Sequence, residues 1–103
     1  MNNTYYEILR KYYESDEQDI YNHAAQEFID ETKAHQTMDC NEIKQTQFDK
    51  LEDAKAVFDA IKNDKTNWTK SIVLQKVSEN WETDENGEEE FIDEEFEIIE
   101  VVK

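Results

Sequence analysis

One continuous apolar stripe with helical spacing runs through residues 48–63. Its members recur every three or four positions: Leu51, Ala54, Val57, Phe58 and Ile61. This spacing places them on one side of a helix, so we predict an amphipathic helix here. Asp49 is placed to cap the first turn, and Phe48 before it to pack against that turn.

The last third of the chain predicts two long strands, residues 70–82 and 88–103, joined at Asn86-Gly87. Asn-Gly favours a two-residue type I′ turn, in which both central residues have positive φ. If Glu85 faces Glu88, Val77 faces Phe96, Trp81 faces Ile92 and Lys76 faces Glu97, and one face of the hairpin is largely apolar. Strands of this length predict a bulge or frayed ends.

The first third of the chain is ambiguous. Residues 4–14 fit a helical stripe, but their Tyr and Ile content favours a strand. Residues 16–35 carry apolar side chains at i, i+4 and i+8, starting at Ile20, and predict a second amphipathic helix. Residues 36–47 are polar and predict a connection.

We therefore expect an α+β fold in the order β-α-α-β-β, with two helices packed on a small antiparallel sheet. If residues 4–14 are helical, the fold becomes three helices against a hairpin. The length of 103 residues is typical of one domain, spanning residues 1–103.

The composition is strongly acidic, with 27 Asp and Glu against 11 Lys and Arg, a net charge of −16. Such charge is typical of disordered chains, but 12% aromatic residues and the patterning above favour a folded protein. The sequence has no apolar run of membrane-spanning length and no pattern of a secretory leader. A single Cys, Cys40, excludes a disulfide framework and is typical of a reducing cytoplasm, here expected to be that of a bacterial cell.

The charge is concentrated in the predicted hairpin. Residues 1–76 hold 15 acidic and 10 basic residues, whereas residues 77–102 hold 12 acidic residues and no basic one. The acidity argues against nucleic acid or an anionic membrane as a direct partner. Carboxylates spaced along two strands imitate a phosphate track, so we predict that a basic partner binds these residues: Glu82, Asp84, Glu85, Glu88, Glu89, Glu90, Asp93, Glu94, Glu95 and Glu97. The alternative is a solvated edge kept acidic against aggregation.

Two weaker patterns resemble metal sites. Residues 82–93 approach the calcium loop of EF-hands, with Gly87 at its sixth position, but with two substitutions and strand-like flanks. His23 and Glu27 are four residues apart on a predicted helix, with His35, Asp39 and Cys40 following, but this spacing matches no zinc motif. We expect no metal, no cofactor and no catalytic centre, because no nucleophile has a recognisable base.

Five tyrosines gather near the amino end, where they suit either an interface or the rim of a small sheet: Tyr5, Tyr6, Tyr12, Tyr13 and Tyr21. If they form an interface, the partner of this chain would be a second copy of itself, in a homodimer.

Three segments, FDKLEDAKAVFDAIK, SIVLQKV and FEIIEVV, resemble small α+β proteins of phages and mobile elements in low-GC bacteria. Ten Lys against one Arg, with no Pro, suits such a genome. In size and charge the chain resembles the acidic inhibitors that these elements encode, including anti-CRISPR and antirestriction DNA mimics. Those families share no common motif, so the resemblance transfers no residue roles.

The sequence thus favours a non-enzymatic acidic inhibitor that occupies the nucleic-acid site of a basic protein, such as a CRISPR effector or a restriction enzyme. The competing hypothesis is a self-associating accessory or regulatory protein whose charge only keeps it dissolved. An enzyme is a third option without a motif to support it.

Overall fold

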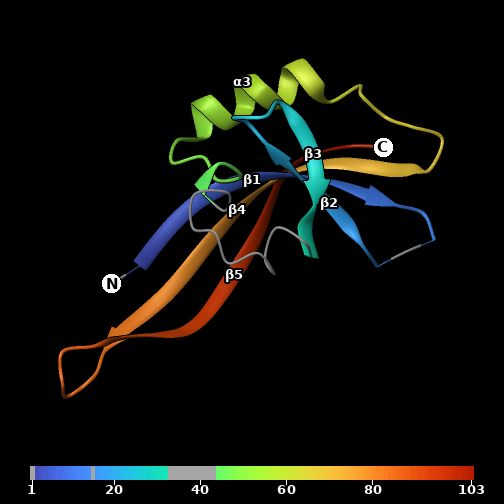
Figure 1. Cartoon of the computed structure of the whole chain (residues 1–103). Helices are drawn as coiled ribbons and strands as arrows, with labels where there is room; N and C mark the ends of the chain where they lie inside the picture. Colours follow the sequence, from blue (N-terminus) through green and yellow to red (C-terminus); the bar gives the residue numbers. More distant parts are fainter. Residues whose placement is uncertain (1, 15, 33–43) are drawn as a thin grey trace.

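The computed structural model describes residues 2–14, 16–32 and 44–103. A five-stranded antiparallel sheet dominates the fold, with the order β3-β2-β1-β4-β5 (Figure 1). Its strands and the helix packed on it are β1 (Asn2–Tyr12), β2 (Gln18–Asn22), β3 (Glu27–Asp30), α3 (Leu51–Ile61), β4 (Thr69–Thr83) and β5 (Glu89–Val102).

The main core lies between α3 and one face of the sheet, called the α3 face below. Ala54 and Phe58 of α3 are fully buried, against strand side chains such as Ile8, Ile72 and Leu74. The opposite face has a smaller cluster, in which Leu9 and Ile20 pack with Ile29. Both faces of the central strands are therefore apolar where the sheet is widest.

The predicted order β-α-α-β-β is wrong, because the region predicted as the first helix forms a hairpin. Within residues 16–32, β2 and β3 pair with Ile20 opposite Ile29 and Tyr21 opposite Phe28. Tyr21 and Phe28 join the α3-face core, and Ile20 and Ile29 the opposite cluster. Because both faces of these short strands carry apolar side chains, the apolar positions also fit the spacing of an amphipathic helix.

Local turn chemistry explains why a helix does not form there. The side-chain oxygen of Asn22 accepts hydrogen bonds from the backbone N–H groups of Ala24 and Ala25, each at 3.0 Å. Gln26 completes the turn with a positive φ of 57°. Asn side chains form such turns readily and so compete with helix formation. Ala24, which occupies the i+4 position of the predicted helical pattern, and its neighbour Ala25 lie exposed in this turn.

Residues 4–14 are confirmed as a strand up to Tyr12, which overturns the alternative of three helices. β1 occupies the centre of the sheet, between β2 and β4. The helix predicted within residues 48–63 is also confirmed, as α3. Its predicted cap is wrong: Lys50 is the N-cap residue and makes no side-chain capping bond. Phe48 instead pairs with Tyr6 through two backbone hydrogen bonds of 2.8 Å and is buried.

The carboxy-terminal hairpin is confirmed, with Val77 opposite Phe96 and Lys76 opposite Glu97 as predicted. The register shifts twice, leaving Ile92 and Ile99 of β5 as extra residues, so Trp81 faces Phe91 rather than Ile92. The second shift also places Val102 opposite Ile72, on the α3 face. Both shifts are bulges of the kind expected for long strands.

The turn of this hairpin is longer than predicted. Gly87 has a positive φ of 82°, whereas the φ of Asn86 is not positive. The Gly87 N–H donates to the Asp84 carbonyl at 3.0 Å, and the Asp84 N–H to the Glu88 carbonyl at 2.8 Å. A tight turn followed by a left-handed glycine is the usual three-residue alternative to type I′.

Candidate functional site

The paired strands β4 and β5 form a ribbon that extends past α3 and ends at the turn of residues 84–88 (Figure 1). Because of this projection the molecule measures 51 × 28 × 25 Å, and its radius of gyration is 14.7 Å. A compact chain of this length has a radius of about 13 Å. We call residues 77–97 the acidic ribbon; all ten predicted binding residues belong to it and are exposed.

The strand register sorts these ten acids between the two faces of the acidic ribbon. Paired residues share a face, and Ile72 and Leu74 define the α3 face of β4. Counting along the pairs places five acids on the α3 face: Glu82, Glu90, Asp93, Glu95 and Glu97. Glu89 and Glu94 lie on the opposite face, while Asp84, Glu85 and Glu88 form the turn.

The α3 face of the acidic ribbon concentrates charge without neutralising it. Glu82 lies directly opposite Glu90, a like-charge pair that destabilises a sheet. Among the described residues, none of the ten acids makes an ion pair. Lys76, opposite Glu97, is the last basic residue before the carboxy-terminal Lys103. A cationic partner would therefore meet carboxylates that are exposed and uncompensated.

The ion pairs that the structure does contain lie on the body of the fold. Arg10 contacts Asp19 at 2.8 Å, and Lys55 contacts both Asp59 and Glu100. The hydrogen bond from Lys55 to Glu100 raises the pKa of that lysine, and the contact with Lys55 lowers the pKa of Asp59. Acidic and basic side chains are thus mixed on the body of the fold, whereas the acidic ribbon carries acidic side chains and no basic one.

The opposite face of the acidic ribbon carries aromatic and apolar side chains beside Glu79, Glu89 and Glu94. The rings of Trp81 and Phe91 meet edge to face, with centroids 5.3 Å apart. Next along β5, Phe96 and Ile98 are 56% and 57% exposed. β5 is also an edge strand of the sheet. This side offers apolar contact area, which the sequence predicted as one apolar face of the hairpin.

The calcium-loop pattern has a different structural role. One carboxylate oxygen of Asp84 accepts backbone N–H bonds from Asn86 and Glu88, each at 2.9 Å. The flanking segments are strands, and the described residues contain no cluster of three metal-ligating side chains. Asp84 therefore stabilises the turn of the acidic ribbon.

The helical pair His23 and Glu27 does not exist, because both residues belong to the β2–β3 hairpin. A ring nitrogen of His23 lies 3.2 Å from the Gln47 carbonyl oxygen, and its ring lies 4.9 Å from that of Phe48. His35, Asp39 and Cys40, together with most of the predicted connection at residues 36–47, lie outside the described residues.

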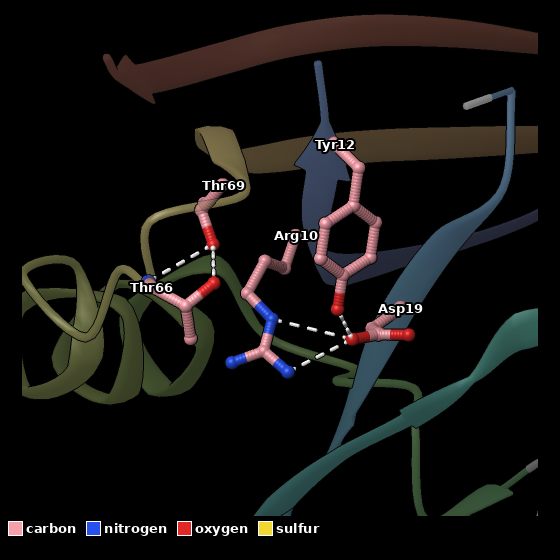
Figure 2. Close-up of polar contacts among 5 residues, drawn as sticks. All are labelled: Arg10, Tyr12, Asp19, Thr66 and Thr69. Atoms are coloured by element: carbon pink, nitrogen blue, oxygen red, sulfur yellow. Dashed lines mark hydrogen bonds and ion pairs between the residues drawn. The ribbon is translucent and has the colours of Figure 1, made fainter. Parts of the chain in front are cut away.

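The five tyrosines are distributed over the sheet and do not form one cluster. Tyr21 packs against Phe28 in the core, with ring centroids 5.2 Å apart. The Tyr12 hydroxyl donates to Asp19, the same carboxylate that Arg10 binds (Figure 2). Tyr5 is half-buried on the face opposite α3, whereas Tyr13 is exposed.

A pocket that sequence analysis missed lies at the other end of β4 from the acidic ribbon. Its volume is about 630 Å³, and the described residues that line it are Tyr12, Tyr13, Glu14, Glu17, Asn67 and Trp68. The available signal was Trp68, a large aromatic residue inside the polar segment 63–69, which is turn-rich. Only the pairing of β1 with β4 brings this turn beside Tyr13.

Comparisons with protein-family models, with curated proteins and with solved structures give no match. The described part of the chain contains no helix long and apolar enough to cross a membrane.

Proposed function

We propose that this chain is a non-enzymatic inhibitor that binds a basic nucleic-acid-binding protein through the α3 face of its acidic ribbon. The chain would occupy the groove in which the partner holds nucleic acid. CRISPR effectors and restriction enzymes are the partner classes that the resemblance in size and charge suggests.

The observation that carries this proposal is the density of charge on the α3 face, which holds five of the ten acids and pairs none of them with a base. Alternate residues of a strand are about 6.6–6.8 Å apart, and adjacent strands lie just under 5 Å apart. Lys and Arg side chains that grip phosphates through charge-assisted hydrogen bonds can bind carboxylates in the same way. A surface that serves only solubility intersperses both signs and avoids like-charge pairs such as Glu82 with Glu90.

The second candidate function is self-association, and the apolar face of β5 favours it. Phe91, Phe96 and Ile98 are exposed on the same side of an edge strand. Two copies that bury these residues against each other would form a dimer, with the carboxylates of the α3 face directed outward. Light scattering separates the candidates, because this one gives twice the monomer mass and the first requires no dimer.

The test of the proposed function is capture followed by competition. The immobilised chain is incubated with a nuclease-treated lysate of a low-GC bacterium, and each captured protein is then purified. We expect a captured DNA- or RNA-binding protein whose apparent affinity for its nucleic acid falls in proportion to the concentration of the chain. Capture of proteins whose nucleic-acid binding the chain leaves unchanged would contradict occupation of that site.

A further inference from the structure

The pocket beside Trp68 has a lining of unusual chemistry for an exposed surface. Of the six described residues that line it, three are aromatic, and two more are the acids Glu14 and Glu17. Tyr13 and Trp68 are 66% and 71% exposed, although burying such rings would stabilise the core. None of the described lining residues is basic. The pocket therefore combines π faces with negative charge.

Backbone contacts fix the position of these aromatic residues. The Tyr13 N–H donates to the Trp68 carbonyl at 3.2 Å, which joins the end of β1 to the turn before β4. The hydroxyl of Thr69 accepts the Thr66 N–H at 3.1 Å and lies 2.9 Å from the Thr66 hydroxyl (Figure 2). The backbone at Trp68 is thus held in a closed turn beside Tyr13.

The same region already pairs a guanidinium with aromatic rings inside the fold. Arg10 lies 4.5 Å from the centroid of the Phe28 ring and 5.9 Å from that of Tyr12. Its two nitrogens bind Asp19, at 3.2 and 2.8 Å (Figure 2). Asp19 is therefore paired within the fold and is not among the described residues that line the pocket, whose acids are Glu14 and Glu17.

We propose that this pocket binds a guanidinium group, such as that of an exposed arginine side chain. A guanidinium is planar, stacks on aromatic faces and donates paired hydrogen bonds to carboxylates, which is the combination that Trp68, Tyr13 and the two glutamates offer. The site is independent of the acidic ribbon, since Thr69 and Thr83 mark opposite ends of β4. The chain would then bind cations at both ends of this strand.

The test uses N-acetyl-argininamide as the probe and Trp68 fluorescence as the signal, in a Trp81→Phe background that leaves Trp68 as the one tryptophan. We expect saturable binding of the arginine probe, and none of the citrulline analogue, which has nearly the same shape without the charge. The lysine analogue should bind more weakly. Equal responses to the arginine and citrulline probes, or no response to either, would overturn the proposal.

Two matched double variants separate the pocket from general electrostatic attraction. Glu14→Gln with Glu17→Gln removes two charges at the pocket, and Glu52→Gln with Asp53→Asn removes two exposed charges in the first turn of α3, outside both proposed sites. In calorimetry with the arginine probe, we expect the first double variant to weaken binding about tenfold and the second to leave the affinity within about twofold. Trp68→Leu should weaken binding between about twofold and thirtyfold. Equal losses for both pairs would show attraction by net charge alone. The acidic-ribbon proposal is unaffected by that result, because it depends on carboxylates at the other end of β4.

Discussion

At the scale of single residues, Tyr5 links the packing of β1 to the pH dependence of stability. Burial, and secondarily the charges of Glu7 and Glu79, raises the pKa of its phenol above the ordinary value of about 10. Between about pH 10 and the raised pKa, the unfolded chain releases this proton while the folded chain retains it. Stability therefore decreases as the pH rises above about 10.

Tyr5→Phe should remove this alkaline component. We expect the loss of unfolding free energy between pH 9 and pH 11 to be smaller in the variant than in the natural chain, as measured by urea denaturation. Tyr13→Phe, at an exposed position, is the control and should follow the natural chain. Equal losses in Tyr5→Phe and the natural chain would show that Tyr5 does not titrate differently in the two states.

At the scale of elements, Gly87 sets the geometry of the turn that closes the acidic ribbon. A Cβ added there would meet nothing within 4 Å, so the free-energy cost of Gly87→Ala comes only from the left-handed backbone conformation of this residue. We expect about 1 kcal/mol of destabilisation, with a smaller loss for Gly87→Asn, because Asn tolerates this conformation better. Denaturation curves of the three proteins check the order. An alanine variant as stable as the natural protein would rule out this account of the turn.

Elements with a single strong signal were predictable from the sequence. The stripe that includes Ala54 and Phe58 gave α3, and the Asn-Gly pair gave the hairpin. β2 and β3 were not predictable. Each is short and has apolar side chains on both faces, so its apolar positions also fit the spacing of a helix. The outcome is decided by the pairing of β2 with β1, as between Leu9 and Ile20, and by the Asn22 turn. The bulges at Ile92 and Ile99 are likewise settled by packing against β4.

Of the two candidate sites, likewise, one was predictable from the sequence and one was not. The acidic ribbon was visible as a run of charge, but the faces of Glu89 and Glu90 depend on the bulge at Ile92. The pocket beside Trp68 was not visible, since its residues come from two turns that only the sheet brings together.

At the scale of the whole molecule, a net charge of −16 opposes folding by self-repulsion. The acidic ribbon contributes most of it without ion pairs, and salt screens such exposed charges over about 10 Å at 0.1 M. We expect the melting temperature to rise by several degrees between 10 and 200 mM NaCl. Neutralising Glu82, Glu90 and Glu95 with Gln should reduce this rise. A melting temperature independent of salt would mean that repulsion does not limit stability.

The central claim is that one face of the acidic ribbon, rather than net charge, binds a basic partner. Two triple variants with the same charge test it most directly: Glu82, Glu90 and Glu95 to Lys on the α3 face, and Glu85, Glu89 and Glu94 to Lys at the turn and on the opposite face. The measurement is the affinity of each for the captured nucleic-acid-binding protein. We predict that the first triple abolishes binding and that the second weakens it only modestly. Equal losses for both would reduce the effect to net charge, and unchanged affinity of the first triple would contradict the account.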